Sequence, residues 1–165
     1  MELLYRYVLE ERGEIMDNAI RLTAAGMIEQ LPPFVRQPLE QLIADSAAND
    51  QMVLCLALSY GSREDIVRAA RHLAREVQAG RISLEQIDEQ ALASALATAD
   101  LPPVDLLIRT SGELRLSNFL LWEVAYAELF FTPVSWPEFR RDQLFAALAA
   151  FQQRERRFGR LPLSC

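Results

Sequence analysis

Two continuous apolar runs of strand length constrain the fold of this chain more than any other feature. They are "MVLCLALSY" (52–60) and "VDLLIRT" (104–110). An apolar run without alternation is typical of a strand in a parallel sheet, where both faces of the strand are covered. The shorter segment "IRLTAAG" (20–26), which ends in a glycine, predicts a third strand.

Segments with helical periodicity lie between and around these runs. Apolar residues recur at helical spacing in 2–18 and, after two prolines, in 32–50. The longest segment, "GSREDIVRAARHLAREVQAG", predicts a helix that begins with a capping box of Ser62 and Asp65 and ends before Gly80. A second predicted capping box follows, and its residues are Ser83 and Gln86.

The last third of the chain predicts a buried helix, a short strand and a closing helix. The buried helix spans 118–128, the strand lies in 129–136 before Pro133 breaks it, and the closing helix spans 137–159. Strands that alternate with helices predict an α/β fold, with a mostly parallel sheet and helices on both faces. We expect a single domain over residues 1–165, because no linker or internal repeat interrupts the pattern.

Composition excludes several classes of protein. The net charge of −6 argues against nucleic-acid binding, which needs a basic face. Two cysteines cannot form a disulfide framework, and the single histidine cannot build a histidine-based metal site. The acidic N-terminus does not resemble a signal peptide, and no apolar run is long enough for a transmembrane segment. We therefore expect a cytoplasmic protein.

A polar loop with two arginines follows the second apolar run. Arg109 stands at the carboxyl end of the predicted strand, where open α/β sheets bind ligands, and Gly112 allows a sharp turn. Arg115, Ser117 and Asn118 precede the predicted helix, whose amino end would offer free backbone N–H groups. Together these groups could bind a diphosphate. The alternative is that both arginines pair with local acids, Glu113 and Asp105, and that Ser117 only caps the helix.

Glu128 is the second unusual residue, because it lies in a strongly apolar segment. A buried carboxylate needs a partner or a metal. A magnesium ion that also contacts phosphate oxygens would satisfy Glu128, and an ion pair with a nearby arginine would do so equally well.

The residues around this loop resemble those of a known family, the cis-prenyltransferases or isoprenyl transferases. The resemblance rests on "DLLIRTSGELRLSNFLLWEVAYAELFF" (105–131), followed by "WPEF" (136–139) and "RERRFG" (154–159). It extends upstream through "GEIMDNAIRLTAAG" (13–26) and "LALSYGSREDIVRAARHLA" (56–74), and so covers nearly the whole chain.

This resemblance implies a fold, a reaction and a set of site residues. The reaction would add isopentenyl diphosphate to an allylic diphosphate, such as farnesyl diphosphate, with magnesium as cofactor, and give a Z-polyprenyl diphosphate lipid carrier. The partners would be those two diphosphates and a second copy of the chain in a homodimer. The resemblance implies a substrate-binding role for Arg109, Arg115, Leu116, Ser117, Asn118, Arg157 and Gly159 and a magnesium-binding role for Glu128. The last two substrate-binding residues would reach the diphosphate across the dimer interface.

One family element has no counterpart in the 165 residues. The family opens with strands that lead into an Asp-Gly-Asn-Gly-Arg loop, whose aspartate is central to catalysis and whose amides bind the allylic diphosphate. We therefore expect that the chain is N-terminally truncated, lacks a catalytic residue of its own and is inactive in isolation. The alternatives are a non-catalytic partner subunit that contributes the isopentenyl diphosphate site and an anion-binding α/β module unrelated to prenyl chemistry.

Overall fold

The structure, a computed structural model, describes residues 1–154 of the chain. The chain divides into two compact units, Met1–Asp100 and Leu101–Cys165. The α/β prediction is confirmed, because both units contain parallel strands connected through helices or long crossovers. The prediction of a single domain stays a prediction.

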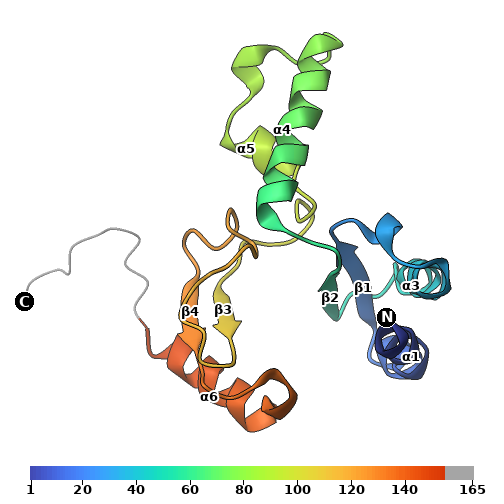
Figure 1. Cartoon of the computed structure of the whole chain (residues 1–165), viewed down its shortest axis with the longest axis vertical. Helices are drawn as coiled ribbons and strands as arrows, with labels where there is room; N and C mark the ends of the chain where they lie inside the picture. The colour runs from blue at the N-terminus through green and yellow to red at the C-terminus, as the bar shows by residue number, and fades with distance from the viewer. Residues whose placement is uncertain (155–165) are drawn as a thin grey trace, which may run out of the picture. The chain divides into compact units, whose positions relative to one another are not determined.

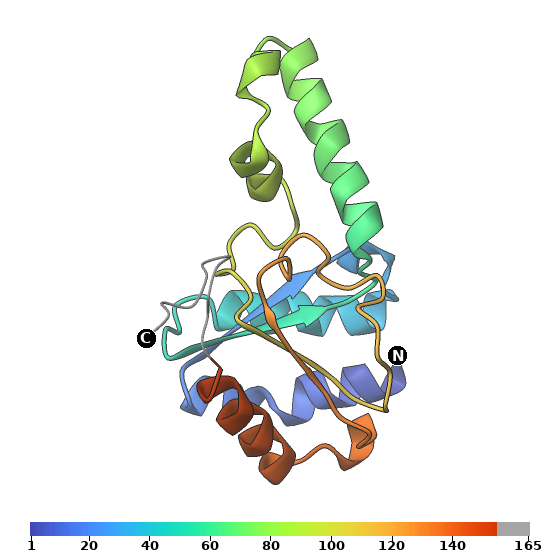
Figure 2. The same ribbon diagram turned by 90° about the vertical axis from the view of Figure 1, so that its left-hand side faces the viewer.

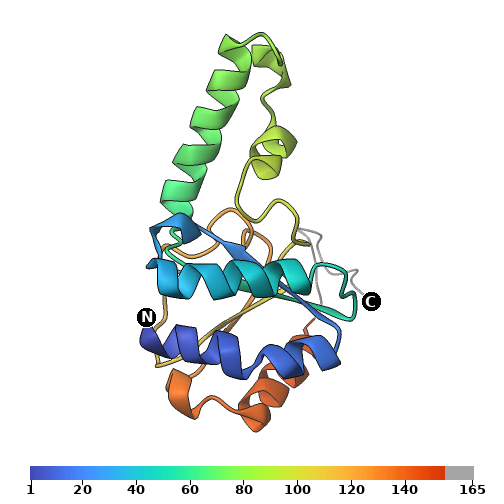
Figure 3. The ribbon, with the colours of Figure 1, turned by 90° about the vertical axis from the view of Figure 1, so that its right-hand side faces the viewer.

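Unit 1 begins with a layer of helices packed on two parallel strands. Its first elements are α1 (Glu2–Glu10), α2 (Arg12–Asp17), β1 (Ile20–Ala25), a 3₁₀ turn (Ile28–Gln30), α3 (Pro33–Asp45) and β2 (Met52–Ala57). The strands β1 and β2 pair in parallel, from Ile20 opposite Met52 to Ala25 opposite Ala57. Helices α1 and α3 lie side by side on the same side of this ladder (Figures 1 and 3).

The core of unit 1 lies between these helices and β1. Leu22, Leu39 and Leu42 are almost completely buried there, together with Val8 and Ile15. The predicted strand at β2 is confirmed, but the expected coverage of both faces is not found for Met52–Leu54. These three side chains are exposed, although consecutive residues of a strand point to opposite faces, so neither face is covered at this end of β2 within unit 1.

The second part of unit 1 is a helical excursion formed by α4 (Ser62–Gln78), a 3₁₀ turn (Leu84–Gln86) and α5 (Glu89–Ser94). Helix α4 runs away from the strands and the chain returns beside it through α5 (Figure 2). Gly80 follows the C-cap of α4 with φ +67°, and the capping box of Ser83 and Gln86 is present, so both predictions are confirmed.

The predicted capping box at the start of α4 is wrong. The N-cap residue is Gly61, and no side chain caps the helix there. The buried carboxylate of Asp65 instead accepts hydrogen bonds from the backbone N–H of Ala97, at 3.2 and 3.1 Å, and pairs with Arg68 at 2.8 Å. The carboxylate of Asp65 therefore binds a distant residue, Ala97, in place of the predicted contact at the start of its own helix.

Unit 2, as far as residue 154, contains β3 (Leu106–Arg109), β4 (Glu128–Phe131), a 3₁₀ turn (Trp136–Glu138) and α6 (Arg141–Gln152). Both predicted strands are confirmed, and they pair in parallel. Helix α6 packs against β4 (Figure 1). The closing helix starts at Arg141 and not at Pro137, which belongs to the 3₁₀ turn; the predicted end at Gly159 lies outside the described residues.

The buried helix predicted over 118–128 is wrong. The segment forms turns, with one helix-like hydrogen bond from Val124 N–H to Leu120 O at 3.0 Å, and Glu128 is already the first residue of β4. Ser117 and Leu120 have φ values of +63° and +50°, which a right-handed helix does not allow. The apolar composition correctly indicated burial at Val124, but it did not fix the backbone conformation.

Candidate functional site

The two-arginine loop is attached by its backbone to the segment that follows β4. Arg109 is the last residue of β3, as predicted, and its carbonyl accepts a hydrogen bond from Thr132 N–H at 3.0 Å. Thr132 O in turn accepts from Gly112 N–H at 2.9 Å. Gly112 has φ +70°, a conformation that favours glycine, so the sharp turn predicted here is present.

The two arginines of the loop converge on one carboxylate. The Nη1 of Arg109 donates to the backbone oxygen of Arg115 at 2.6 Å, and its Nη2 lies 4.0 Å from Oε2 of Glu113. Arg115 forms an ion pair with the same oxygen. The pairing of both arginines with Glu113, which the sequence left open as an alternative, is therefore what the structure contains. Asp105 lines the second polar site of unit 2, which is described below.

This arrangement has the chemistry of an anion site. The Glu113 carboxylate lies between two guanidinium groups, where a phosphate group could be held. A carboxylate and a phosphate both present anionic oxygens that accept paired N–H bonds from arginine. Arg109 is 22% exposed and Arg115 is 65% exposed, so the pair is accessible from solvent on the Arg115 side.

The other predicted substrate-binding residues follow in the same loop. Ser117 is exposed, whereas Leu116 and Asn118 are half-buried. Because no helix begins at Asn118, the predicted supply of free amides from a helix N-terminus is wrong. Arg157 and Gly159 lie outside the described residues.

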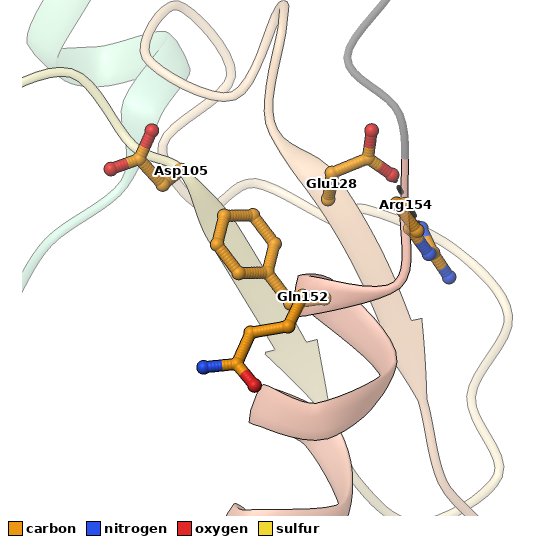
Figure 4. A pocket seen from close by; sticks show the side chains of 5 residues that line it. Asp105, Glu128, Gln152 and Arg154 are labelled. Carbon is orange, nitrogen blue, oxygen red and sulfur yellow. Dashed lines mark hydrogen bonds and ion pairs between the residues drawn. The ribbon is translucent and has the colours of Figure 1, made fainter.

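Glu128 lies in a second polar site of unit 2, at the amino end of β4. Its carboxylate is 27% exposed, and Oε2 accepts a hydrogen bond from Nη1 of Arg154 at 2.5 Å. The alternative of an ion pair with a nearby arginine is therefore present in the structure. A cavity of about 380 Å³ opens at this pair and is lined by Asp105, Glu128, Phe151, Gln152 and Arg154 (Figure 4).

The donor atoms in this cavity fit one part of a magnesium site. Glu128 supplies carboxylate oxygens, and the remaining ligands of a magnesium ion are commonly water and phosphate, whereas the Asp105 carboxylate points away from Glu128 (Figure 4). Within residues 1–154, no three acidic, histidine or cysteine side chains lie close enough to bind a metal by themselves. Glu128 could therefore hold the ion only together with a ligand that brings its own oxygens.

The structure does not bring Glu128 and Arg109 of one chain together. Glu128 pairs with Leu106 at the start of β3, and Arg109 pairs with Phe131 at the end of β4. Three residues of strand separate the two positions by about 10 Å, and an odd offset places their side chains on opposite faces. Within one chain, the two-arginine loop and the Glu128 cavity are therefore separate sites.

Sequence reasoning assigned no specific role to Arg154. It is the first residue of "RERRFG", and positive charge near the end of a helix is common, so its residue type alone does not mark a site. The signal that could have identified it is weak, because its partner Glu128 lies far away in the sequence.

Unit 1 also contains a cavity that the sequence did not indicate. Its volume is about 470 Å³, and it lies beside the start of α4. It is lined by Met27, Arg63, Glu64, Val67, Arg68 and Arg71. One of its arginines, Arg68, is already paired with Asp65.

Comparison with known proteins identifies the family. A family model described as "Putative undecaprenyl diphosphate synthase" matches residues 1–159. The chain is 46% identical to an isoprenyl transferase of Chlorobaculum tepidum over 160 residues, which are 97% of this chain and 60% of that protein. The chain belongs to this family of isoprenyl transferases.

Two further relatives support this assignment. The chain is 44% identical to a ditrans,polycis-undecaprenyl-diphosphate synthase, (2E,6E)-farnesyl-diphosphate specific, of Pseudomonas syringae pv. tomato, over 97% of this chain and 63% of that protein. The crystal structure of lavandulyl diphosphate synthase from Lavandula x intermedia, in complex with dimethylallyl diphosphate, superposes with a TM-score of 0.92 at 36% identity, and covers 96% of this chain and 69% of that one. The chain thus spans less than two thirds of the length of the two bacterial isoprenyl transferases compared. None of the helices in residues 1–154 is long and apolar enough to cross a membrane.

Proposed function

We propose that this isoprenyl transferase chain binds isopentenyl diphosphate on the loop that follows β3, for condensation with an allylic diphosphate to a Z-polyprenyl diphosphate. The observation that carries the proposal is the convergence of Arg109 and Arg115 on the carboxylate of Glu113. A diphosphate would replace the Glu113 carboxylate between these two guanidinium groups. It carries more negative charge than one carboxylate, and it therefore interacts more strongly with the two arginines.

Each residue of the loop has a proposed role. Arg109 and Arg115 bind the diphosphate, and Ser117 donates its hydroxyl to a phosphate oxygen. Leu116 and Asn118, which are half-buried, hold the loop in place. Glu128 contributes an oxygen to magnesium, which neutralises diphosphate charge when it is bound.

The assembly is also part of the proposal. We place the protein in the cytoplasm as a homodimer, in which Arg157 and Gly159 of one copy reach the diphosphate bound by the other. Glu128 and Arg154 support this arrangement, because they lie at the opposite end of the β3–β4 ladder from Arg109 of their own chain. Residues at that end of the ladder are better placed to contact a ligand bound by a second copy than one bound by their own loop.

The allylic substrate is proposed from the relatives. The Pseudomonas syringae relative is named as farnesyl-diphosphate specific, so farnesyl diphosphate is the first candidate. The 165 residues contain no Asp-Gly-Asn-Gly-Arg segment, to which the family resemblance assigns the allylic diphosphate and the catalytic aspartate. We therefore expect the 165-residue chain by itself to bind isopentenyl diphosphate without forming product from farnesyl diphosphate.

Calorimetric titration of the 165-residue chain with isopentenyl diphosphate tests the proposal. Arg109→Ala should weaken binding roughly tenfold to a hundredfold, because a charge-assisted contact with the diphosphate is lost. Arg81→Ala is the matched control, since Arg81 is an exposed arginine of unit 1 that pairs with Glu76, and it should leave the affinity unchanged. Equal affinities for Arg109→Ala and the parent would refute the proposed site.

A further inference from the structure

The ion pair between Glu128 and Arg154 joins two elements that are separated in the sequence. Glu128 is fixed by the ladder, because its N–H donates to Asp105 O at 2.9 Å and it pairs with Leu106. Arg154 is fixed by the end of α6, because its N–H donates to Phe151 O at 3.1 Å. The two side chains therefore meet from firmly placed backbones, and Figure 4 shows them against each other at the cavity.

This contact uses the carboxylate that is proposed to bind magnesium. Oε2 of Glu128 accepts a charged hydrogen bond from Nη1 of Arg154 at 2.5 Å, which occupies part of the acceptor capacity that a metal would use. The guanidinium also places a positive charge next to the position of the cation, and like charges at that distance repel each other. Arg154 is thus a competitor of a divalent cation for Glu128.

We propose that Arg154 is a positioning residue that holds Glu128 until a divalent cation arrives together with a diphosphate. Glu128 then exchanges the guanidinium for the cation, and Arg154 turns to the phosphate oxygens. Charges alternate along the new contact, from carboxylate to cation, from cation to phosphate and from phosphate to guanidinium. The inference rests on the proposed function, since it takes Glu128 as the residue that contacts the metal.

The cavity supports the exchange because it has room and both signs of charge. Its volume is about 380 Å³, and its lining includes the carboxylate of Glu128 against the guanidinium of Arg154, with Asp105 farther along the wall. The exchange also couples the cation to the diphosphate: a cation alone must break the ion pair, whereas a cation with a diphosphate gives Arg154 a new partner. Arg154 would therefore disfavour the free cation and favour the cation–diphosphate complex.

Electron paramagnetic resonance titrations with Mn²⁺, with and without inorganic diphosphate, test this inference without an activity assay. Arg154→Gln should bind free Mn²⁺ about fivefold more tightly than the parent, the effect expected from the loss of one partly exposed ion pair. In saturating inorganic diphosphate the order should reverse, and Arg154→Gln should bind Mn²⁺ roughly tenfold more weakly. Glu128→Gln gives the level of binding that does not involve this carboxylate.

Arg154→Lys is the matched variant, because it keeps the charge and loses the planar fork. It should stay within about threefold of the parent in both titrations. Far-UV circular dichroism checks that each variant is folded. If Arg154→Gln shifts both titrations in the same direction, shifts neither, or never exceeds the level of Glu128→Gln, the inference is wrong and the ion pair only ties α6 to β4.

The outcome is separable from that of the proposed function. The titrations use inorganic diphosphate and Mn²⁺ and report on Glu128, whereas binding of isopentenyl diphosphate reports on Arg109. If Arg109→Ala weakens binding of isopentenyl diphosphate but the Mn²⁺ affinity of Arg154→Gln does not reverse with diphosphate, only this inference is wrong. If the Mn²⁺ affinity reverses but Arg109→Ala binds isopentenyl diphosphate as the parent does, the exchange at Glu128 stands and the proposed isopentenyl diphosphate site is wrong.

Discussion

The two units of the chain are held together in different ways. In unit 1, an apolar core is shared by α1, α3 and β1, and Leu39 is completely buried within it. In the described part of unit 2, few large apolar side chains are fully buried, and Leu114, Tyr126 and Trp136 are largely exposed. Charged hydrogen bonds, such as those of Arg109 and Arg154, connect its segments. Unit 1 is therefore a packed scaffold, while unit 2 carries polar sites on short strands.

In each unit a glycine with positive φ follows a strand, but the space around the two glycines differs. Gly26 follows β1 and Gly112 follows β3, and both have positive φ, at +107° and +70°. A Cβ atom at Gly26 would lie 2.2 Å from Leu58 O, whereas at Gly112 the nearest atom, Cα of Pro133, is 3.9 Å away. Packing closes the first turn completely, and the second keeps open space beside the two-arginine loop.

The largest expected effect separates the packed unit from the polar one. Leu39→Ala should lower the free energy of unfolding by about 2–5 kcal/mol, because it opens a cavity in a closed core. Leu114→Ala, at a side chain that is 78% exposed, should change it by less than about 0.5 kcal/mol. Urea denaturation followed by circular dichroism measures both. A cost at Leu114 equal to that at Leu39 would contradict the comparison.

The second effect sharpens the comparison of the two glycine turns. Gly26→Ala should cost about 2–3 kcal/mol, because both the backbone conformation and the carbonyl of Leu58 oppose a Cβ atom. Gly112→Ala should cost about 1 kcal/mol, since only the backbone conformation opposes it. The same denaturation experiment decides the order, and Gly13→Ala, where the added Cβ meets no atom within 4 Å, is the control.

A smaller effect is expected at Asp65, the one buried carboxylate whose partners bridge α4 and the segment after α5 in unit 1 as described here. Asp65→Asn should destabilise the protein by about 1–2 kcal/mol, because it removes the charge that Arg68 pairs with and one acceptor for Ala97 N–H. Hydrogen exchange at the Ala97 amide should accelerate. Asp50→Asn, at an exposed carboxylate, serves as the control, and unchanged exchange at Ala97 would show that the bridge is unimportant.

The smallest effect concerns the pH dependence of unit 1. The Arg12 guanidinium, 2.7 Å from Asp45, and the amide of Gln41 hold the pKa of the Asp45 carboxyl below its usual range. Because the pKa is lower in the folded state than in the unfolded state, the stabilisation is complete above the unfolded pKa of Asp45 and is lost as pH falls through the folded one.

Asp45→Asn and Arg12→Gln should therefore reduce stability slightly at pH 7 and flatten the loss of stability below about pH 4. Thermal melts between pH 7 and the acid transition measure this. A slope that is identical in the parent and in both variants would show that the pair does not contribute to acid sensitivity.

Much of the fold followed from local patterns, because periodicity reports which faces are buried. The strands that begin at Ile20, Met52 and Leu106, and the position of Arg109 at a strand end, were predicted correctly. The errors arose where the backbone follows tertiary partners. Asp65 binds Ala97 instead of capping its own helix, and the apolar segment before Glu128 turns at Leu120 instead of forming a helix.

The candidate sites show the same limit. The sequence named both Arg109 and Arg115 and offered Glu113 as a possible partner, and the structure places all three together. It also named Glu128, but not Arg154 as its partner. The first group lies within one short loop, whereas the second depends on where α6 ends relative to β4.

By itself the sequence determined the α/β class, the order of the strands, the family and the arginines of the loop, because these depend on side-chain chemistry and on neighbours along the chain. Only the tertiary structure decided that β4 begins at Glu128, that Arg154 contacts it, and that this cavity lies at the other end of the ladder from Arg109. The physical reason is that strand register and helix ends are set by contacts between distant residues. No local pattern contains that information.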